Sequence, residues 1–202
     1  MAIRYIEICA GTSDPRYPQH RSNALAAGIF VDSNDAYQLK YDSNGTDTTL
    51  QVRNPGLAAS VTAATFTPTP GVNGDRITGI DRAAGTTITL PAATGSGAKY
   101  QFAIKTTLTS GSLVLQVANA NDYFRGFAYT TQDAGGAGIS WGTANTGTVS
   151  TESDTLTWNR TTTGIATQGD YIEVIDAFAN VWLIETEQNS NGTEATPFSA
   201  AV

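Results

Sequence analysis

The sequence predicts an all-β protein: an antiparallel β-sandwich of jelly-roll type, preceded by an extended N-terminal arm and a small β-meander. Three observations lead to this fold class. The chain contains 20 Gly together with many Thr, Ser and Asn residues, which suit strands and turns better than helix interiors. Apolar and polar residues alternate in short runs that are bounded by turn residues. No segment shows a long helical period, so strands must form the core.

The first part of the chain indicates an arm followed by a small β region. A short strand is expected over residues 3–9. The segment 11–23, GTSDPRYPQHRSN, contains two prolines and has no period, so we expect an extended arm or an ordered loop. Arms of this kind often become structured only against a partner. Three strands follow, and Asn44-Gly45 supplies the positive φ values of a tight hairpin turn. We expect these three strands at residues 29–31, 37–41 and 48–52.

A linker separates this region from the main domain. Residues 54–74 are rich in small residues and contain Pro68, Pro70 and Gly71, so we place a domain boundary near residue 70. The chain then comprises an N-terminal arm with a small β region, 1–70, and a β-sandwich domain, 71–202. Weak polar alternation in the strands of the second domain predicts that both of their faces are covered. We expect these strands at residues 76–80, 86–90, 99–105, 112–118, 122–129, 147–151, 155–159, 170–176 and 181–186.

The stretch from residue 85 to 105, GTTITLPAATGSGAKYQFAIK, shows the strand pattern most clearly. Ile88 and Leu90 share one face of the first strand, and Tyr100, Phe102 and Ile104 share one face of the second. The connection between the two strands contains a proline, which cannot donate to a ladder, and glycines, which permit positive φ. A surface loop is therefore predicted between two half-buried strands.

The strands at 170–176 and 181–186 form the clearest predicted pair, joined by a hairpin loop at 177–180. Both strands alternate strictly in side-chain direction. We assign Trp158 and Trp182 to the core.

The charge distribution excludes some classes of partner. The net charge is −7: residues 1–70 hold five Lys/Arg against six acids (−1), and residues 71–202 hold six against twelve (−6). An acidic main domain repels phosphate, so we expect no nucleic-acid partner. The chain has one cysteine, which cannot form an intramolecular disulfide, and no apolar run of membrane-spanning length. Arg4 and Glu7 interrupt the apolar residues at the N-terminus, so we expect a soluble protein made without export and no membrane partner.

Three segments of the main domain carry a family resemblance. DRAAGTTITLPAATGSGAKYQF (81–102), GDYIEVIDAFANVWLIE (169–185) and GTEATPF (192–198) resemble a recurring C-terminal domain of tailed-bacteriophage virion structural proteins. Such proteins are head decoration (capsid cement) or head-fibre-like components. The resemblance covers residues 72–200 and rests on turn and strand phrases rather than on a catalytic signature. It implies a non-enzymatic protein on the outer surface of the phage head, made in the host cytoplasm.

The favoured interpretation is therefore a cement protein that binds the major capsid protein and bridges neighbouring capsid subunits, which would stabilise the shell. We expect a symmetric homo-oligomer, a trimer, because closed symmetry matches capsid axes and covers sheet edges. Arg and Tyr side chains are over-represented at interface anchors, so those of the N-terminal arm are the expected capsid contacts. These contacts, with the neighbouring histidine, are Arg4, Tyr5, Arg16, Tyr17, His20 and Arg21.

The sequence offers little for catalysis. His20 is the single histidine, so neither a histidine metal cluster nor a triad is expected, and we predict no catalytic, cofactor or metal residues. Two carboxylate pairs, Glu152/Asp154 and Glu185/Glu187, have the two-residue spacing that places side chains on one strand face about 6–7 Å apart, as in some glycosidases. We interpret both pairs as a solvated acidic face and keep a polysaccharide-degrading enzyme as the least favoured hypothesis.

The aromatic residues support one alternative function. Exposed aromatic rings can stack on sugar rings, whereas buried ones are core or interface residues. A carbohydrate- or receptor-binding head or tail fibre would use Trp141, Tyr123 and Tyr129 as glycan contacts.

Overall fold

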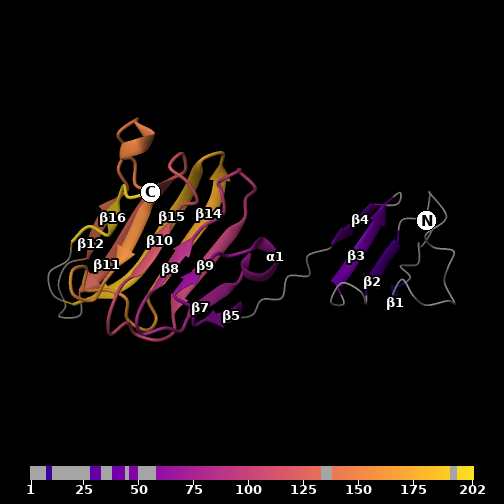
Figure 1. Ribbon diagram of the computed structural model, residues 1–202, viewed down its shortest axis with the longest axis horizontal. Coiled ribbons are helices and arrows are strands. Elements are labelled where there is room, and N and C mark those ends of the chain that lie inside the picture. The colour runs from indigo at the N-terminus through magenta and orange to yellow at the C-terminus, as the bar shows by residue number, and fades with distance from the viewer. Residues whose placement is uncertain are drawn as a thin grey trace. The chain divides into compact units, whose positions relative to one another are not determined.

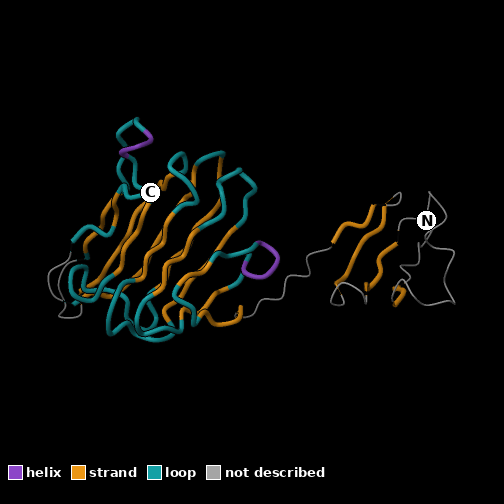
Figure 2. Tube along the Cα trace, viewed as in Figure 1, coloured by secondary structure: helices purple, strands orange, loops and turns teal. Residues whose placement is uncertain are grey.

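The computed structural model divides the chain into two compact units, Met1–Asn54 and Pro55–Val202. In the described residues almost all regular structure is strand, and the helical elements there are α1 (Pro70–Asn73) and η1 (Val149–Thr151) (Figure 2). In the first unit only the backbone of four strands is described. Outside these strands the described residues are 58–132, 138–191 and 195–202.

The Met1–Asn54 unit contains a four-stranded sheet in the order β1-β2-β3-β4. β2, β3 and β4 form the predicted antiparallel meander, with Ser43 opposite Thr46 across the hairpin, and β1 pairs with β2 in parallel. The predicted arm at 11–23 lies outside the described residues, as do all six expected capsid-contact residues. The strands are β1 (Ile8–Ala10), β2 (Gly28–Asp32), β3 (Gln38–Ser43) and β4 (Thr46–Thr49).

The Pro55–Val202 unit is a β-sandwich of two sheets (Figure 1), which confirms the predicted all-β sandwich class. One sheet has five strands in the order β16-β13-β10-β8-β6, and the other has seven in the order β12-β11-β15-β14-β9-β7-β5. The five-stranded sheet consists of β6 (Thr65–Phe66), β8 (Thr86–Thr89), β10 (Leu113–Gln116), β13 (Thr155–Trp158) and β16 (Phe198–Ser199). The seven-stranded sheet consists of β5 (Ala58–Val61), β7 (Ile77–Ile80), β9 (Lys99–Ile104), β11 (Tyr123–Gln132), β12 (Ile139–Gly142), β14 (Tyr171–Phe178) and β15 (Val181–Ser190).

Strands β5 to β10 alternate between the two sheets along the chain. Strands β5 to β8 therefore each pair in parallel with the strand two positions later: β5 with β7 and β7 with β9 in one sheet, β6 with β8 and β8 with β10 in the other. β11 also pairs in parallel with β15, whereas β14 pairs antiparallel with both β9 and β15. The sheets are thus mixed rather than purely antiparallel, because the chain crosses between sheets instead of turning back within one.

The strands β8 and β9 illustrate this crossing. The predicted alternation is correct, since Ile88, Tyr100, Phe102 and Ile104 are all buried. The two strands nevertheless belong to different sheets, and the connection between them passes from one sheet to the other. Alternation in a sequence defines which face of a strand is buried, but not which strand lies beside it.

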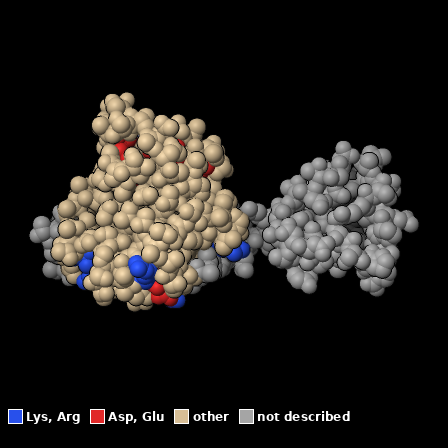
Figure 3. Space-filling model, in the orientation of Figure 1, with Lys and Arg blue, Asp and Glu red and all other residues tan. Residues whose placement is uncertain are grey.

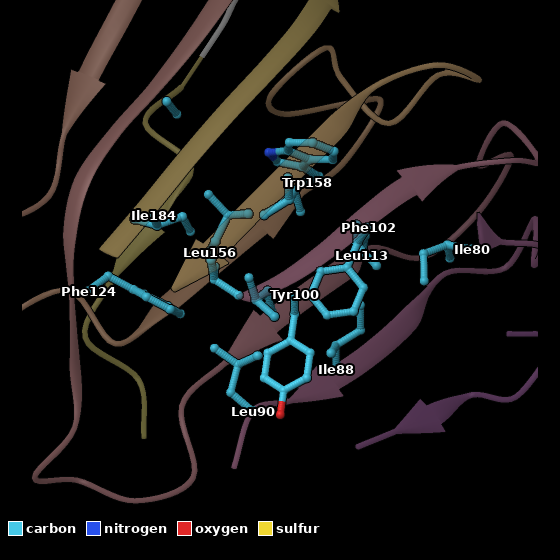
Figure 4. Close-up of a cluster of buried hydrophobic side chains, with 14 of the residues drawn as sticks. Ile80, Ile88, Leu90, Tyr100, Phe102, Leu113, Phe124, Leu156, Trp158 and Ile184 are labelled. Carbon is cyan, nitrogen blue, oxygen red and sulfur yellow. The ribbon is translucent and has the colours of Figure 1, made fainter. Parts of the chain in front are cut away.

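The core fills the space between the two sheets (Figure 4). The rings of Tyr100 and Trp182 lie 5.8 Å apart, and Trp158 is fully buried, so the assignment of both tryptophans to the core is confirmed. Burial of large apolar side chains is the main source of stability in a unit of this size. Further core residues that Figure 4 labels are Ile80, Ile88, Leu90, Phe102, Leu113, Phe124, Leu156 and Ile184.

A buried carboxylate holds the crossover between β8 and β9. Asp176 Oδ1 accepts hydrogen bonds from the backbone amides of Thr94 (2.9 Å) and Gly95 (2.7 Å). Its Oδ2 accepts from the amide and hydroxyl of Ser96 (3.1 and 2.6 Å) and from the Thr94 hydroxyl (3.0 Å). Burial raises the pKa of Asp176, but these hydrogen bonds together lower it below its usual range. The glycines Gly95 and Gly97 have positive φ, as the sequence predicts.

Three further details differ from the sequence-based expectations. β5 and β6 belong to the sandwich, so the division between the units falls at residues 54 and 55 rather than near residue 70. Residues 147–151, expected as a strand, form a loop that ends in η1, because Glu152 accepts hydrogen bonds from the amides at its start. The outer face of β15 is exposed instead of covered, since alternate residues from Leu183 to Asn189 point to solvent.

Candidate functional site

The outer face of the seven-stranded sheet carries several exposed aromatic and acidic side chains. On β15, Trp182, Ile184 and Thr186 point into the sandwich, so Glu185 and Glu187 point outward. On β11 the outward residues include Phe127 and Tyr129, which are 44% and 42% exposed. The strand register places Phe127 beside Glu185 and Tyr129 beside Glu187. Aromatic rings and carboxylates therefore alternate across this face.

The two glutamates of β15 occupy the expected positions. Glu185 and Glu187 share one face, and within the described chain neither makes a salt bridge or a side-chain hydrogen bond. Both are exposed, as expected of a solvated acidic face. The general acid of a glycosidase normally lies in a desolvated pocket, whereas both glutamates of β15 lie exposed at the sheet surface.

A third glutamate on this face is held by structural contacts. Glu173 forms an ion pair with Lys99 (2.7 Å) and accepts hydrogen bonds from Gln101 and from the Tyr171 hydroxyl (both 3.0 Å). Burial raises the pKa of Glu173, but these partners together lower it below its usual range. Burial, together with the bond to Glu173, raises the pKa of Tyr171 to about 12. The phenol group of Tyr171 is therefore neutral, and its hydrogen bond to Glu173 holds it in place.

The other predicted carboxylate pair, Glu152 and Asp154, is buried and not a solvated face. Glu152 forms an ion pair with Arg125 (2.7 Å) and accepts from two loop amides, which lowers its pKa to about 2. Asp154 accepts from the backbone amides of Ala201 (2.7 Å) and Val202 (3.2 Å). Both carboxyls therefore hold structure: one holds the loop before β13, and the other holds the C-terminal residues.

The three aromatic residues expected to contact glycans do not lie together. Trp141 of β12 is opposite the fully buried Ala128 and packs against the core, so it faces the interior. Tyr123 lies at the start of β11 with the guanidinium of Arg125 4.4 Å from its ring centre. Tyr129 lies six residues further along the same strand, about 20 Å away. Of the three, Tyr129 alone has an exposed ring without a cation over it among the described residues.

Apolar side chains gather at the hairpin between β14 and β15. Ile175 lies opposite Leu183, and Phe178 lies opposite Val181. Phe178 is 66% exposed and Leu183 is 41% exposed, the other two being half-buried. These four residues are called the hairpin patch below. Contiguous exposed apolar side chains of this kind are typical of protein–protein contacts.

A groove lies near the other end of the outer face, beside Tyr129. It has a volume of about 700 Å³, and its walls are the ends of β11 and β15 and the loop before β14. The loop side includes Thr167, Gln168 and Asp170, and the strand side includes Tyr129 and Glu187. We call this the Tyr129 groove. The sequence indicated Tyr129 and Glu187 as separate candidates. No sequence pattern indicated that the loop before β14 lies beside them.

Among the described residues, no group of three or more His, Cys, Asp or Glu side chains has the arrangement of a metal site. In that part of the chain there is also no helix with the length and apolar character that a membrane crossing requires. The face of the Pro55–Val202 unit seen in Figure 3 carries few charged side chains. The two surface features of the described chain that could bind a partner or a ligand are thus the hairpin patch and the Tyr129 groove.

Comparison with family models and curated proteins assigns no function to this chain, so a functional assignment rests on its own residues. No protein-family model matches the chain, and no curated protein matches it.

Proposed function

We propose that this chain is a non-enzymatic structural protein of a phage virion, a decoration (cement) protein on the outer surface of the head. In this proposal the chain binds the major capsid protein through the Met1–Asn54 unit, while β5 and β6 belong to the sandwich. The sandwich forms the outer layer and joins neighbouring copies in a trimer. Repeating a modest interface at every symmetry-related site turns a small free energy into a large stabilisation of the shell.

The observation that carries this proposal is the contrast between the buried carboxylates of the sandwich and its exposed apolar side chains. Its buried carboxylates, such as Glu152, Asp154 and Asp176, are used in holding loops and the chain end. Among its exposed large apolar side chains, Phe178 and Leu183 lie together in the hairpin patch, whereas others, such as Val72 and Val149, lie elsewhere on the unit. A patch of this type on a stable scaffold is suited to contact with another protein rather than to turnover of a substrate. We infer that a neighbouring copy covers the patch in the trimer.

The test uses phage heads that lack the protein, to which the purified full-length chain is added back. Co-sedimentation measures binding to the heads, and heating with a DNA-binding dye measures the temperature at which DNA is released. Saturable binding and a higher release temperature are expected. Heads that bind no protein, or that release DNA at an unchanged temperature, contradict the proposal.

The trimer is tested separately by analytical ultracentrifugation. The wild-type chain should sediment at about three times its monomer mass of 21.1 kDa. Leu183→Asp, which places a charge in the hairpin patch, should shift the protein towards monomer. Glu185→Gln, on the same strand and the same face, is the matched control and should remain trimeric. A trimer that Leu183→Asp does not weaken would show that another surface joins the copies.

A carbohydrate- or receptor-binding fibre protein is the second candidate function. The observation in its favour is the exposed ring of Tyr129 beside a groove. Cryo-electron microscopy of the parent particle separates the two functions. Density spread over the head lattice supports a decoration protein, whereas density at a tail tip or fibre end supports a receptor-binding one.

A further inference from the structure

We propose that the Tyr129 groove binds a neutral saccharide, with a sugar ring against the tyrosine and sugar hydroxyls on Glu187, Asn189 and Gln168. This site is independent of the decoration role, since it lies in the sandwich and uses none of the residues of the hairpin patch. The volume of about 700 Å³ falls within the range of about 300–1,000 Å³ usual for small-molecule sites. Such a volume accommodates a short oligosaccharide.

A glycine leaves room for the aromatic ring of the groove. Gly138 lies directly against Tyr129, because a Cβ added at Gly138 would be 2.4 Å from the tyrosine Oη and 2.8 Å from Cε2. A side chain at position 138 would therefore displace the ring. The rest of the ring is open to the groove, since Tyr129 is 42% exposed. An exposed aromatic ring matches the apolar C–H face of a pyranose.

The polar groups of the groove complement sugar hydroxyls. Glu187 and Asn189 both point outward from β15, and Gln168 and Asn191 are exposed at the groove as well. A carboxylate accepts hydrogen bonds, and an amide side chain both donates and accepts them. A hydroxyl also does both, so each sugar hydroxyl can find a partner in this set.

The loop wall is rigid because a buried carboxylate holds it. Asp170, 3% exposed, accepts at Oδ2 from the amides of Ala166 and Thr167 (both 2.8 Å) and from the Thr167 hydroxyl (3.0 Å). Its Oδ1 accepts from the amide of Asn189 (3.0 Å), which ties the loop to β15. Asp170 is therefore engaged in positioning, and Glu187 remains as the carboxylate that faces a ligand.

The charge of the groove lining determines which class of saccharide can bind. The described lining of the groove contains the acids Asp170 and Glu187 and no Lys or Arg. An anionic sugar would bring a carboxylate or phosphate close to Glu187 without a cation to compensate, which disfavours binding. The same absence of cations in this lining disfavours nucleic acid. A neutral saccharide fits both the charge and the hydrogen-bonding groups.

Saturation-transfer NMR on the full-length protein tests the site. The probes are maltose, lactose, mannobiose and chitobiose, with sialyllactose as the anionic counterpart of lactose. We expect transfer to at least one neutral disaccharide and weaker or no transfer to sialyllactose. No transfer to any neutral probe at millimolar concentration, or a preference for sialyllactose over lactose, overturns the proposal.

Variants then assign the binding to the groove by titration with the best neutral probe. Tyr129→Ala should weaken binding at least tenfold, and Glu187→Gln should weaken it several-fold. Gly138→Ala, which displaces the ring without removing it, should give an intermediate loss. Tyr123→Ala changes a tyrosine on the same strand and face, about 20 Å away, and should bind as the wild type does. Wild-type affinity in both Tyr129→Ala and Glu187→Gln would place the sugar elsewhere and refute the inference.

Discussion

The hydrogen bonds around Asp176 allow one prediction to be developed quantitatively. Asp176→Asn keeps the size of the side chain but replaces one acceptor oxygen with an NH₂ group. The remaining oxygen can serve the amides of Thr94 and Gly95, while the NH₂ group then faces the amide of Ser96, which has a hydrogen to donate and no acceptor. The hydroxyls of Thr94 and Ser96 can rotate to accept from the NH₂ group.

The cost follows from these changes. The backbone N–H of Ser96 belongs to an exposed loop residue, so losing its acceptor costs about 1 kcal/mol, the lower end of the usual range. A hydrogen bond to a neutral acceptor is about half as strong as one to a charged acceptor, which weakens the remaining bonds. We therefore expect the free energy of unfolding to fall by about 3 kcal/mol. In a unit of this size that corresponds to a decrease in melting temperature of about 6–12 °C.

Tryptophan fluorescence measures this change in the relevant unit. All three tryptophans of the chain, Trp141, Trp158 and Trp182, lie in the Pro55–Val202 unit, so their emission during thermal or urea unfolding reports on the sandwich. Glu185→Gln, an equally conservative change at an exposed position, should alter the melting temperature by less than about 2 °C. If Asp176→Asn shifts it no more than Glu185→Gln does, the carboxylate does not hold the crossover as described.

Three other perturbations have defined outcomes in the same assay. Gly126→Ala should cost about 3 kcal/mol or more, because its Cβ would lie 1.8 Å from the carbonyl oxygen of Ile184, whereas Gly142→Ala has open space and should be neutral; similar losses in both would contradict this account. Leu156→Ala should cost about 2–5 kcal/mol by leaving a cavity in the fully buried core, and a loss below 1 kcal/mol would mean that the core can collapse around it. The folded-state pKa of Glu152 is about 2, below its usual 4.5, so the stabilisation by its ionised form is present above pH 4.5 and is lost as the pH falls towards 2. The stability difference between wild type and Glu152→Gln should therefore shrink over that window, and a difference unchanged at pH 2 would contradict the ion pair.

Much of the sandwich was predictable because its strands alternate strictly. Tyr100, Phe102 and Ile104 are buried where the period-2 pattern places them, and the hairpin of β14 and β15 pairs as expected. Sheet membership was not predictable. The alternation around Ile88 and around Tyr100 is the same whether the two strands lie side by side or face each other across the core.

The candidate site was predictable only in part, for a related reason. The sequence indicated Tyr129 as a candidate aromatic contact, but Trp141 was an equal candidate by its chemistry and packs against the core. The difference between the two rings arises from the face of the sheet to which each points. Tyr129 lies opposite Ser140 on the outer face, whereas Trp141 lies opposite Ala128 on the buried face. Gln168 has no distinguishing pattern around it and reaches the groove through the fold of its loop.

The parallel pairing of alternate strands has a consequence for how the chain folds. Thr65 pairs with Thr87 and Thr86 pairs with Leu113, so each contact closes a loop of 22 residues (65 to 87) or 27 residues (86 to 113) before it gains any hydrogen bond. β9 also needs β14, with Tyr100 opposite Val174, far along the chain. Contacts this distant in sequence make folding slow, on the order of milliseconds to seconds. The central strands β9 and β10 therefore remain incomplete on the ribosome until β14 and β13 have been synthesised, so the two sheets are completed late in the synthesis of this unit.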